Sequence, residues 1–170
     1  MSGLVHQRAT DPQAQLQEAL DLSFSYLGHR DRTVAEVRRH LERKRVEPAA
    51  IDGALAELGR LGYLDDARYA QRFAEDRRRL DAWGSDRIAR RLRELGVDRE
   101  HIDAALAAQD PEEEMSAALE LLRRRCPNPP ANRAERDRAL GILVRRGYPP
   151  ELAFDALRRH AGAEAEPDDF

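Results

Sequence analysis

Residues 33–58, with the sequence TVAEVRRHLERKRVEPAAIDGALAEL, decide the fold of this chain of 170 residues, because their apolar positions recur twice. Val37, Ile88 and Ala139 begin three matching sets, and successive sets are 51 residues apart. The sets are Val37, Leu41, Val46, Ile51 and Leu55; Ile88, Leu92, Val97, Ile102 and Leu106; and Ala139, Leu143, Tyr148, Ala153 and Leu157. Three copies of one helical unit explain this pattern, and repeated units stack into extended binding surfaces. The pattern therefore favours a binding protein over an enzyme.

The apolar spacing within each set is helical. Val34, Val37 and Leu41 lie three and four residues apart, and no stretch alternates between apolar and polar residues. Aromatic residues make up 5% of the chain, which is low for a sheet core. We predict an all-α fold of three tandem three-helix repeats, each a helix-turn-helix-like unit, in an elongated arrangement. The predicted segments are a flexible tail over 1–12, repeats over 13–62, 63–109 and 110–160, and a flexible tail over 161–170.

The second helix of each repeat has marked ends. Thr33 and Glu36 have the spacing of a capping box, in which each side chain bonds the backbone amide of the other residue. Gly96 and Gly147 share one repeat position, and glycine can adopt the left-handed conformation that closes a helix. Arg45 holds that position in the first repeat, so we expect a different or slightly strained helix end there.

The junction Gly62-Tyr63-Leu64-Asp65-Asp66 connects the first repeat to the second. We expect Gly62 to end one helix and Asp65 to cap the next. Leu64 stands where a hydrophobic staple would pack on Tyr69, which would set the angle between the helices. We therefore interpret the junction, including Tyr63 and Leu64, as structural.

Composition excludes several classes of site. The formal net charge is -3 although 36% of the residues are charged, so the net charge indicates no polyanionic partner. Cys126 is the single cysteine, which excludes an internal disulfide and a multi-cysteine zinc site. No apolar run approaches the length of a membrane span, and residues 1–10 lack the apolar centre of a signal peptide. We expect a cytoplasmic protein without metal or cofactor.

The repeats, the capped helix that begins at Thr33, and the junction followed by Arg68-Tyr69-Ala70 and Phe73 together resemble the RecX family, bacterial regulators of RecA recombinase. The resemblance runs from about Ala19 to Leu157. It implies a non-enzymatic protein that lies in the groove of the RecA–DNA filament and inhibits recombination, strand exchange and ATP turnover. The implied partner is the RecA filament, with room for sequence-independent contact with single- or double-stranded DNA, and we expect a monomer.

Arginines concentrate in the second repeat. Residues 68–99 hold ten arginines against six acids, so this part of an acidic protein is locally cationic. The candidate contacts with the RecA filament or DNA are Arg68, Arg72, Arg77, Arg78, Arg79, Arg87, Arg90 and Arg91. Pairs one helical turn apart, such as Arg68 with Arg72, project from one face of a helix. Each guanidinium could then bond two oxygens of a phosphate or a carboxylate. A solvated face with pairs such as Glu75 with Arg79 explains the same residues without any partner.

A helix-turn-helix DNA-binding transcriptional regulator is the alternative function. Its third helices would have to read base edges, but the segments 48–57, 99–108 and 150–159 are rich in alanine with acids in the first turns. An enzyme is the weakest hypothesis, because the five histidines form no shared motif with Cys126 and no glycine-rich loop precedes a helix. Trp83 could anchor a partner, although a tryptophan more often closes a small core.

Overall fold

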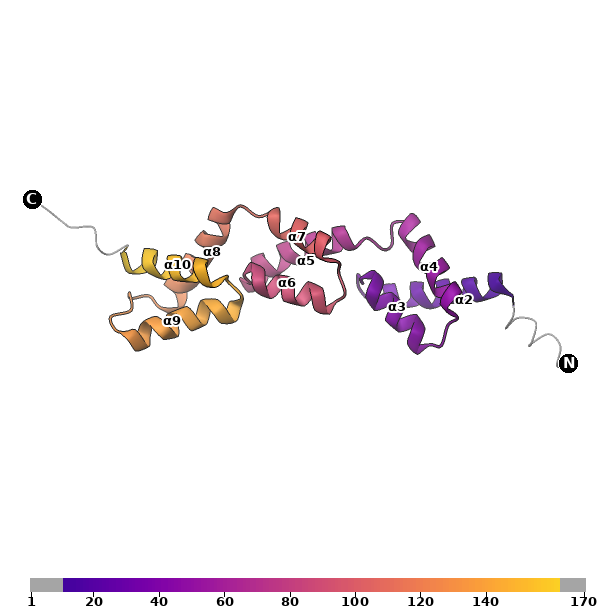
Figure 1. Ribbon diagram of the computed structural model, residues 1–170, viewed down its shortest axis with the longest axis horizontal. Coiled ribbons are helices and arrows are strands. Elements are labelled where there is room, and N and C mark those ends of the chain that lie inside the picture. The colour runs from indigo at the N-terminus through magenta and orange to yellow at the C-terminus, as the bar shows by residue number, and fades with distance from the viewer. Residues whose placement is uncertain (1–10, 163–170) are drawn as a thin grey trace, which may run out of the picture. The chain divides into compact units, whose positions relative to one another are not determined.

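The computed structural model describes residues 11–162, and this part of the chain contains nine α-helices and no strand (Figure 1). The all-α prediction is confirmed. In chain order the helices are α2 (Pro12–Leu27), α3 (Val34–Arg43), α4 (Pro48–Arg60), α5 (Asp66–Asp81), α6 (Ser85–Glu94), α7 (Arg99–Ala107), α8 (Pro111–Arg125), α9 (Arg133–Arg146) and α10 (Pro150–Gly162). None of these helices has the length and apolarity that crossing a bilayer requires.

The outer helices reach slightly into the segments expected to be tails. Helix α2 begins at Pro12, where Asp11 caps it by accepting a hydrogen bond from the Gln13 amide at 3.0 Å. Proline suits this first position because its missing N–H would have had no helical partner. Helix α10 continues to Gly162. The remainder of both expected tails, 1–10 and 163–170, lies outside the described residues.

The chain divides into two compact units that do not follow the sequence repeats. One unit comprises Met1–Ala70 and Arg93–His101, and the other comprises Gln71–Leu92 and Ile102–Phe170. The middle repeat therefore contributes to both units. The reason is that the end of α6 contacts the start of α3 in the first unit, whereas the start of α6 contacts the end of α9 in the second unit.

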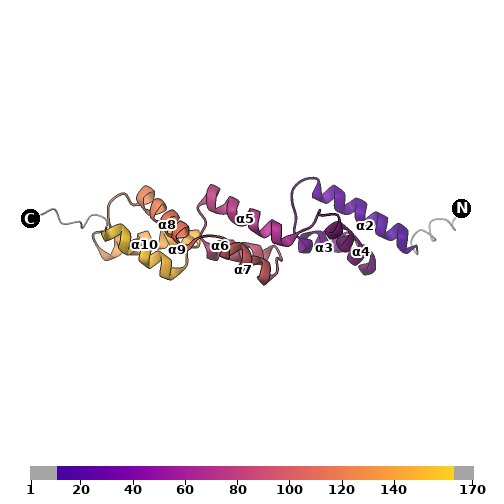
Figure 2. The same ribbon diagram turned by 90° about the horizontal axis from the view of Figure 1, so that it is seen from above.

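The core of the first unit lies among α2, α3 and α4 (Figure 2). Val37, Leu41 and Leu58 are fully buried in it, and each such side chain contributes about 1.5–3 kcal/mol of hydrophobic stabilisation. Ser23 is also buried, and its hydroxyl donates to the Ala19 carbonyl at 2.7 Å, so it adds no unpaired polar group. Leu64 from the junction joins this core with 5% of its surface exposed.

The start of α3 confirms the predicted capping box and adds a contact that the local pattern does not contain. The Glu36 amide donates to Thr33 Oγ1 at 3.2 Å, and the Thr33 amide donates to Glu36 Oε2 at 3.0 Å. The same Thr33 hydroxyl donates to the Leu95 carbonyl at 2.7 Å, at the end of α6. Next to it, Gly96 has a φ of 80°, and a β-carbon there would lie 2.4 Å from Ala35 Cβ. Gly96 is needed both for its conformation and for close approach.

The equivalent contact recurs in the second unit, with backbone in place of the threonine hydroxyl. The Gly84 amide donates to the Arg146 carbonyl at 2.9 Å, and the Asp86 amide donates to the Gly147 carbonyl at 2.9 Å. Gly147 is left-handed with a φ of 86°, as predicted. A β-carbon on Gly84 would lie 2.4 Å from the Gly147 carbonyl oxygen. The start of α6 thus sits directly on the end of α9.

Arg45 holds the repeat position of Gly96 and Gly147 and also adopts a left-handed conformation, with a φ of 60°. This confirms the expected strained helix end, which costs about 1 kcal/mol for a residue with a side chain. Arg45 is exposed, whereas Gly147 is buried under the start of another helix. The left-handed turn is kept in all three repeats, but glycine is required only where a neighbour approaches closely.

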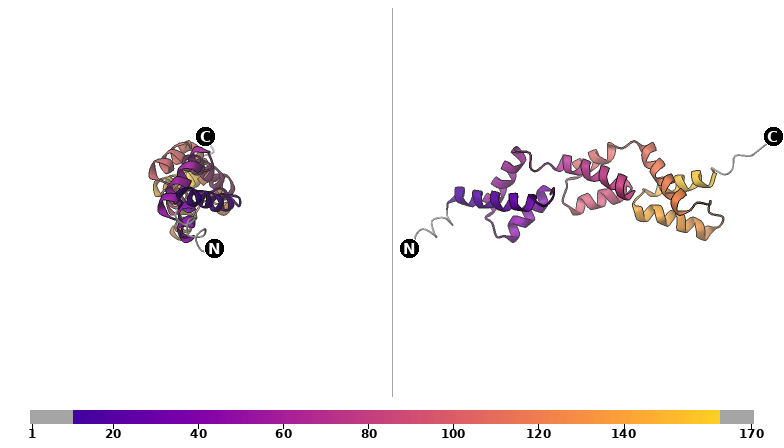
Figure 3. Two further views of the ribbon diagram at one scale, coloured as in Figure 1. Left: turned by 90° about the vertical axis from the view of Figure 1, so that its right-hand side faces the viewer. Right: turned by 180° about the vertical axis from the view of Figure 1, so that it is seen from behind.

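The core of the second unit is built chiefly from α8, α9 and α10, which lie together in the right-hand view of Figure 3. Ala139 and Ala153, which replace larger residues of the earlier repeats, are fully buried. Small side chains at these positions let the helices approach closely, and Tyr148 fills part of the remaining space with 2% of its surface exposed. The Tyr148 hydroxyl finds no hydrogen-bond partner among the described residues, and burial raises the pKa of this group to about 12.

Candidate functional site

The eight predicted contact arginines all lie on α5 and α6, but the structure separates them into two groups. Four have side chains that contact a backbone carbonyl or an aromatic ring, as described below, although one of them, Arg68, is also exposed. The other four are exposed to solvent on the outer faces of the two helices. The first group is Arg68, Arg77, Arg78 and Arg87, and the second is Arg72, Arg79, Arg90 and Arg91.

Arg68 stabilises the junction between α4 and α5. Gly62 ends α4 with a φ of 78°, and Arg68 Nη2 donates to the Gly62 carbonyl at 2.7 Å. The Arg68 amide donates to Asp65 Oδ1 at 2.9 Å, so Asp65 caps α5 as predicted. The cation therefore offsets the carbonyl end of one helix while its own helix begins.

Asp66 has a role that the sequence pattern did not suggest. Its Oδ1 accepts a hydrogen bond from the Val34 amide at 3.0 Å, so it caps the start of α3 from a distant part of the chain. Partial burial raises the pKa of Asp66, although the bond from Val34 acts in the opposite direction. The two neighbouring apolar residues of the junction differ: Leu64 is buried, whereas Tyr63 is 57% exposed and meets the Phe24 ring edge-on at 5.1 Å.

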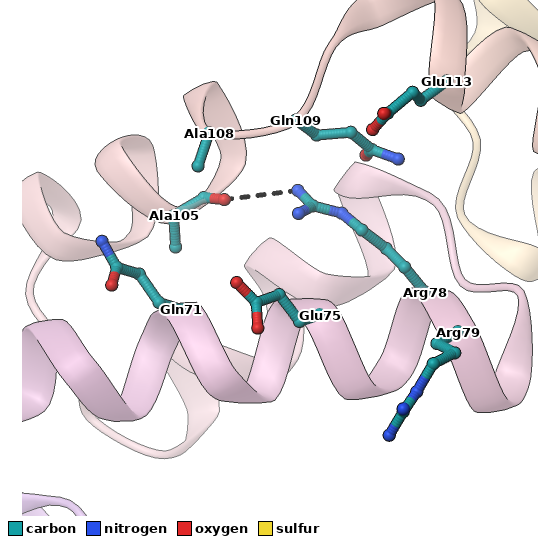
Figure 4. A pocket seen from close by; sticks show the side chains of 8 residues that line it. All are labelled: Gln71, Glu75, Arg78, Arg79, Ala105, Ala108, Gln109 and Glu113. Atoms are coloured by element: carbon teal, nitrogen blue, oxygen red, sulfur yellow. Dashed lines mark hydrogen bonds between the residues drawn. The ribbon is translucent and has the colours of Figure 1, made fainter.

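Arg78 crosses from α5 to the end of α7 (Figure 4). Its Nη2 donates to the carbonyls of Ala105 and Leu106 at 3.3 and 3.5 Å. Burial lowers the pKa of Arg78, while the nearby Glu114 and Glu75 raise it. The side chain forms one wall of a recess of about 420 Å³ that has both acidic and basic residues in its lining. Arg78 is thus an internal tie between two helices.

Trp83 is partly buried, and two arginine side chains lie over its ring. The Arg87 guanidinium lies 4.2 Å from the centre of its ring, and that of Arg77 lies 5.6 Å away. Phe73 packs against the same ring at 6.2 Å, and Arg77 Nη1 bonds Asp81 Oδ2 at 2.6 Å. These cation–π and ring contacts are typical of a small satellite core, which supports the structural interpretation of Trp83.

The exposed arginines extend along the solvent faces of α5 and α6. Arg72 and Arg79 are seven residues apart, which is close to two full turns, so they lie on one face of α5. Arg79 is one of the residues that line the recess of Figure 4, and its guanidinium pairs with Asp76 at 3.4 Å. Glu75, whose spacing also allowed a pair with Arg79, lies on the side that faces Arg78 and α7 (Figure 4).

Sequence reasoning missed a second group of arginines in the second unit. Arg125 and Arg145 line one recess with Arg87 and Arg146, although they come from three helices. The only local signals were the runs 123–125 and 145–146 at helix ends, and such runs usually offset the helix dipole. Their convergence depends on how α6, α8 and α9 pack.

Comparisons with known proteins agree in both sequence and structure. Two family models match the chain: "RecX, first three-helix domain" over residues 19–58 and "RecX, second three-helix domain" over residues 65–106. The regulatory protein RecX of Deinococcus radiodurans is 36% identical over 147 residues, which cover 86% of this chain and 70% of that protein. The regulatory protein RecX of Amycolatopsis mediterranei is 32% identical over 160 residues, which cover 91% of each chain.

The crystal structure of RecX from Lactobacillus salivarius has the same fold, with a TM-score of 0.76 and 17% identity over 86% of this chain and 96% of that chain. A second crystal structure of regulatory protein RecX matches 86% of this chain and 73% of its own with a TM-score of 0.72 and 22% identity. The first matched domain contains the capped helix that begins at Thr33, and the second begins at Asp65, within the junction described above. By sequence and by fold, this chain belongs to the RecX family of regulatory proteins.

Proposed function

We propose that this chain binds the RecA–DNA nucleoprotein filament and inhibits the recombinase and ATPase activities of RecA. The observation that carries the proposal is membership of a family whose curated members are named regulatory proteins. RecA regulation is the role of the RecX family, and its inhibitory form is the part proposed for this chain. We expect it to act in the cytoplasm, as a monomer and without catalysis of its own.

The exposed arginines supply a surface that suits such a partner. Arg72 and Arg79 on α5, with Arg90 and Arg91 on α6, present guanidinium groups to solvent. A planar guanidinium can bond two oxygens of a carboxylate or phosphate at once, so these side chains suit an acidic protein rim or a DNA backbone. The Arg79–Asp76 pair does not oppose this use, because exposed ion pairs are worth about 0–1 kcal/mol and exchange readily.

Repeated units favour binding to a polymer. A chain that makes several weak contacts along a filament gains because, after the first contact, each further one forms at high effective concentration. We therefore expect substitutions on one face to weaken inhibition without abolishing it.

The first experiment measures ATP hydrolysis by the cognate RecA on single-stranded DNA while the purified chain is added. The proposal predicts strong inhibition at far less than one chain per RecA protomer, because a chain bound to a filament affects many protomers. Unchanged hydrolysis at equal concentrations of the two proteins would contradict the proposed inhibition.

The second experiment tests the surface with variants chosen to leave the fold intact. The quadruple variant changes the exposed arginines to glutamine, whereas Arg68 and Arg87 are kept because they bond the Gly62 and Arg145 carbonyls. The test set is Arg72, Arg79, Arg90 and Arg91. A control variant removes the same charge from exposed positions elsewhere, and its set is Arg43, Lys44, Arg123 and Arg138.

We expect the test variant to need about tenfold more protein for half-inhibition, as loss of roughly 1.4 kcal/mol of binding would produce. The control variant should inhibit like the unmodified chain. Equal inhibition by test and control variants, both folded by circular dichroism, would remove the faces of α5 and α6 from the proposed surface.

A sequence-reading regulator remains the alternative, but the third helices give it little support. Helices α7 and α10 carry Glu100 and Glu151 in their first turns, where a reading helix would approach phosphates. Helix α4 buries five of its residues in the core of the first unit. Tighter binding to one duplex sequence than to random duplex at equal salt would favour this alternative.

A further inference from the structure

Four arginines converge on one recess of about 390 Å³ in the second unit. Arg87 comes from α6, Arg125 from α8, and Arg145 and Arg146 from α9. Leu121 and Ile142 complete the lining, which contains no carboxylate among the described residues. This separates it from the recess beside Arg78, whose lining includes Glu75 and Glu113. We refer to it below as the arginine recess.

Two of the four guanidinium groups are fixed by backbone carbonyls. Arg87 Nη1 donates to the Arg145 carbonyl at 3.2 Å, and the ring of Trp83 supports the same side chain. Arg146 Nη1 donates to the Asp81 carbonyl. Each guanidinium has five N–H donors, so both arginines keep donors for a further partner. They form a preorganised side of the arginine recess.

The other two guanidinium groups have no partner among the described residues. Arg125 and Arg145 are both exposed, and within residues 11–162 their side chains make no hydrogen bond or ion pair. The Arg145 side chain folds back along α9, since a β-carbon on Gly141 would lie 2.8 Å from its Nη1. The hydrogen-bond donors of Arg125 and Arg145 are therefore available to a ligand in the arginine recess.

Helix dipoles account for only part of this positive charge. Arg125, Arg145 and Arg146 lie in the last turns of α8 and α9, where a cation offsets the carbonyl end of a helix. The end of each helix is equivalent to roughly half a negative charge, so two ends offset about one of the four guanidinium charges. A charge of roughly three remains in a recess with two apolar walls, which strengthens attraction to an anion.

We propose that the arginine recess is a phosphate-binding site that accepts one or two adjacent phosphate groups. Planar guanidinium groups match the spacing of phosphate oxygens and can donate two hydrogen bonds to one group. Two arginines held by backbone carbonyls and two exposed arginines line the recess together. Polynucleotide strands and free nucleotides share this phosphate chemistry, and the experiment below distinguishes them. The proposal does not depend on RecA, because it concerns the chain alone.

The test variant is Arg125→Gln with Arg145→Gln in the full-length chain. Both side chains are exposed, and neither bonds the contact between α6 and α9, so the fold should be kept. The control variant is Arg123→Gln with Arg138→Gln, which removes the same charge from the same two helices outside the arginine recess. Circular dichroism and thermal unfolding establish that all three proteins are equally folded.

Binding of a fluorescein-labelled oligodeoxythymidine is followed by fluorescence anisotropy at several salt concentrations. We expect the test variant to bind about tenfold more weakly, as loss of charge-assisted hydrogen bonds implies. Its salt slope should fall by roughly 0.7 to 1.4, because each lost phosphate contact on a single strand contributes about 0.7. The control variant should keep the slope of the unmodified chain.

Calorimetric titrations with pyrophosphate and with ADP form the second arm. Heat of binding that is present in the control and lost in the test variant, without a change in oligonucleotide binding, would support a site for free nucleotides. Loss of oligonucleotide binding alone would support a site for a polynucleotide strand. Equal behaviour of test and control variants in both arms would overturn the proposal, because the arginine recess would then contribute nothing beyond general charge.

Discussion

Replacing Gly84 by alanine should break the contact between the start of α6 and the end of α9. A β-carbon at residue 84 would lie 2.4 Å from both the Gly147 carbonyl oxygen and the Tyr148 amide nitrogen. Both are backbone atoms, so no side chain can rotate to relieve the overlap. Gly84 itself does not have a positive φ, so alanine meets no conformational barrier of its own there. The substitution is therefore a steric test of this one contact.

The expected loss can be worked from the contacts. The Gly84 and Asp86 amides donate to the Arg146 and Gly147 carbonyls at 2.9 Å each, and a typical hydrogen bond contributes about 1 kcal/mol. Forcing an extra carbon into a packed contact costs about 1–3 kcal/mol. The two helices can move apart to relieve the overlap, but the two hydrogen bonds are then lost. We expect the free energy of unfolding to fall by about 3 kcal/mol. For a chain of this size the midpoint of thermal unfolding would fall by about 6–12 °C.

Urea and thermal unfolding followed by circular dichroism at the helical band measure this change. Gly59→Ala is the matched control, because a β-carbon there meets nothing within 4 Å and Gly59 lies in α4. Alanine is the better helix former, so the control should gain up to about 1 kcal/mol. If Gly84→Ala unfolds within 0.5 kcal/mol or so of the unmodified chain, this account of the contact is refuted.

Three further predictions concern buried or paired groups. Asp66→Asn keeps an acceptor for the Val34 amide and removes a carboxyl group whose pKa is raised by burial, so unfolding at neutral pH should need at least as much urea as for the unmodified chain. Asp66→Ala removes the acceptor as well, and its free energy of unfolding should fall by about 1 kcal/mol. Tyr148→Phe removes a buried hydroxyl without a partner, and we expect the thermal midpoint to stay or rise, by about 1 kcal/mol of stability at most; a clear fall would show that the hydroxyl is satisfied. Burial opposes ionisation of Glu36, but bonds from Arg30 and the Thr33 amide lower its pKa below the usual 4.5. The stability that the ionised carboxylate contributes is therefore present above pH 4.5 and is lost as the pH falls through the lower pKa of the folded state. The Glu36→Gln variant should accordingly lose less stability than the unmodified chain between pH 5 and 3 or so, as measured by urea unfolding at each pH. Equal losses in the two proteins would contradict the stabilising Arg30–Glu36 ion pair.

The helices and their ends could be predicted because their causes are local. Thr33 and Glu36 are three residues apart, so the capping box depends only on residues within one turn. Gly96 and Gly147 end their helices because glycine tolerates a positive φ wherever it stands. The prediction for Arg45 succeeded because it rested on the shared repeat position, although the left-handed conformation costs a residue with a side chain about 1 kcal/mol. The interior of each repeat followed from apolar spacing, which is a property of the helix itself.

The arginines show where this reasoning stops. Sequence spacing placed Arg78 and Arg79 together in one predicted surface, although they are adjacent on a helix and therefore point in different directions. The structure directs Arg78 to the carbonyls at the end of α7 and leaves Arg79 exposed. Which face of α5 is covered depends on the neighbouring helix, and the charge pattern of the sequence alone does not predict which face that is.

By itself the sequence determined three helical repeats, their capped and left-handed ends, and a strongly cationic middle segment. Tertiary structure alone decided that Gly84 would lie on Gly147, that Asp66 would cap α3, and that Arg87 and Arg125 would share a recess. The first set is fixed by dihedral preferences and by contacts within one or two turns of a helix. The second set depends on distances between segments up to 63 residues apart, which only close packing of the helices brings together.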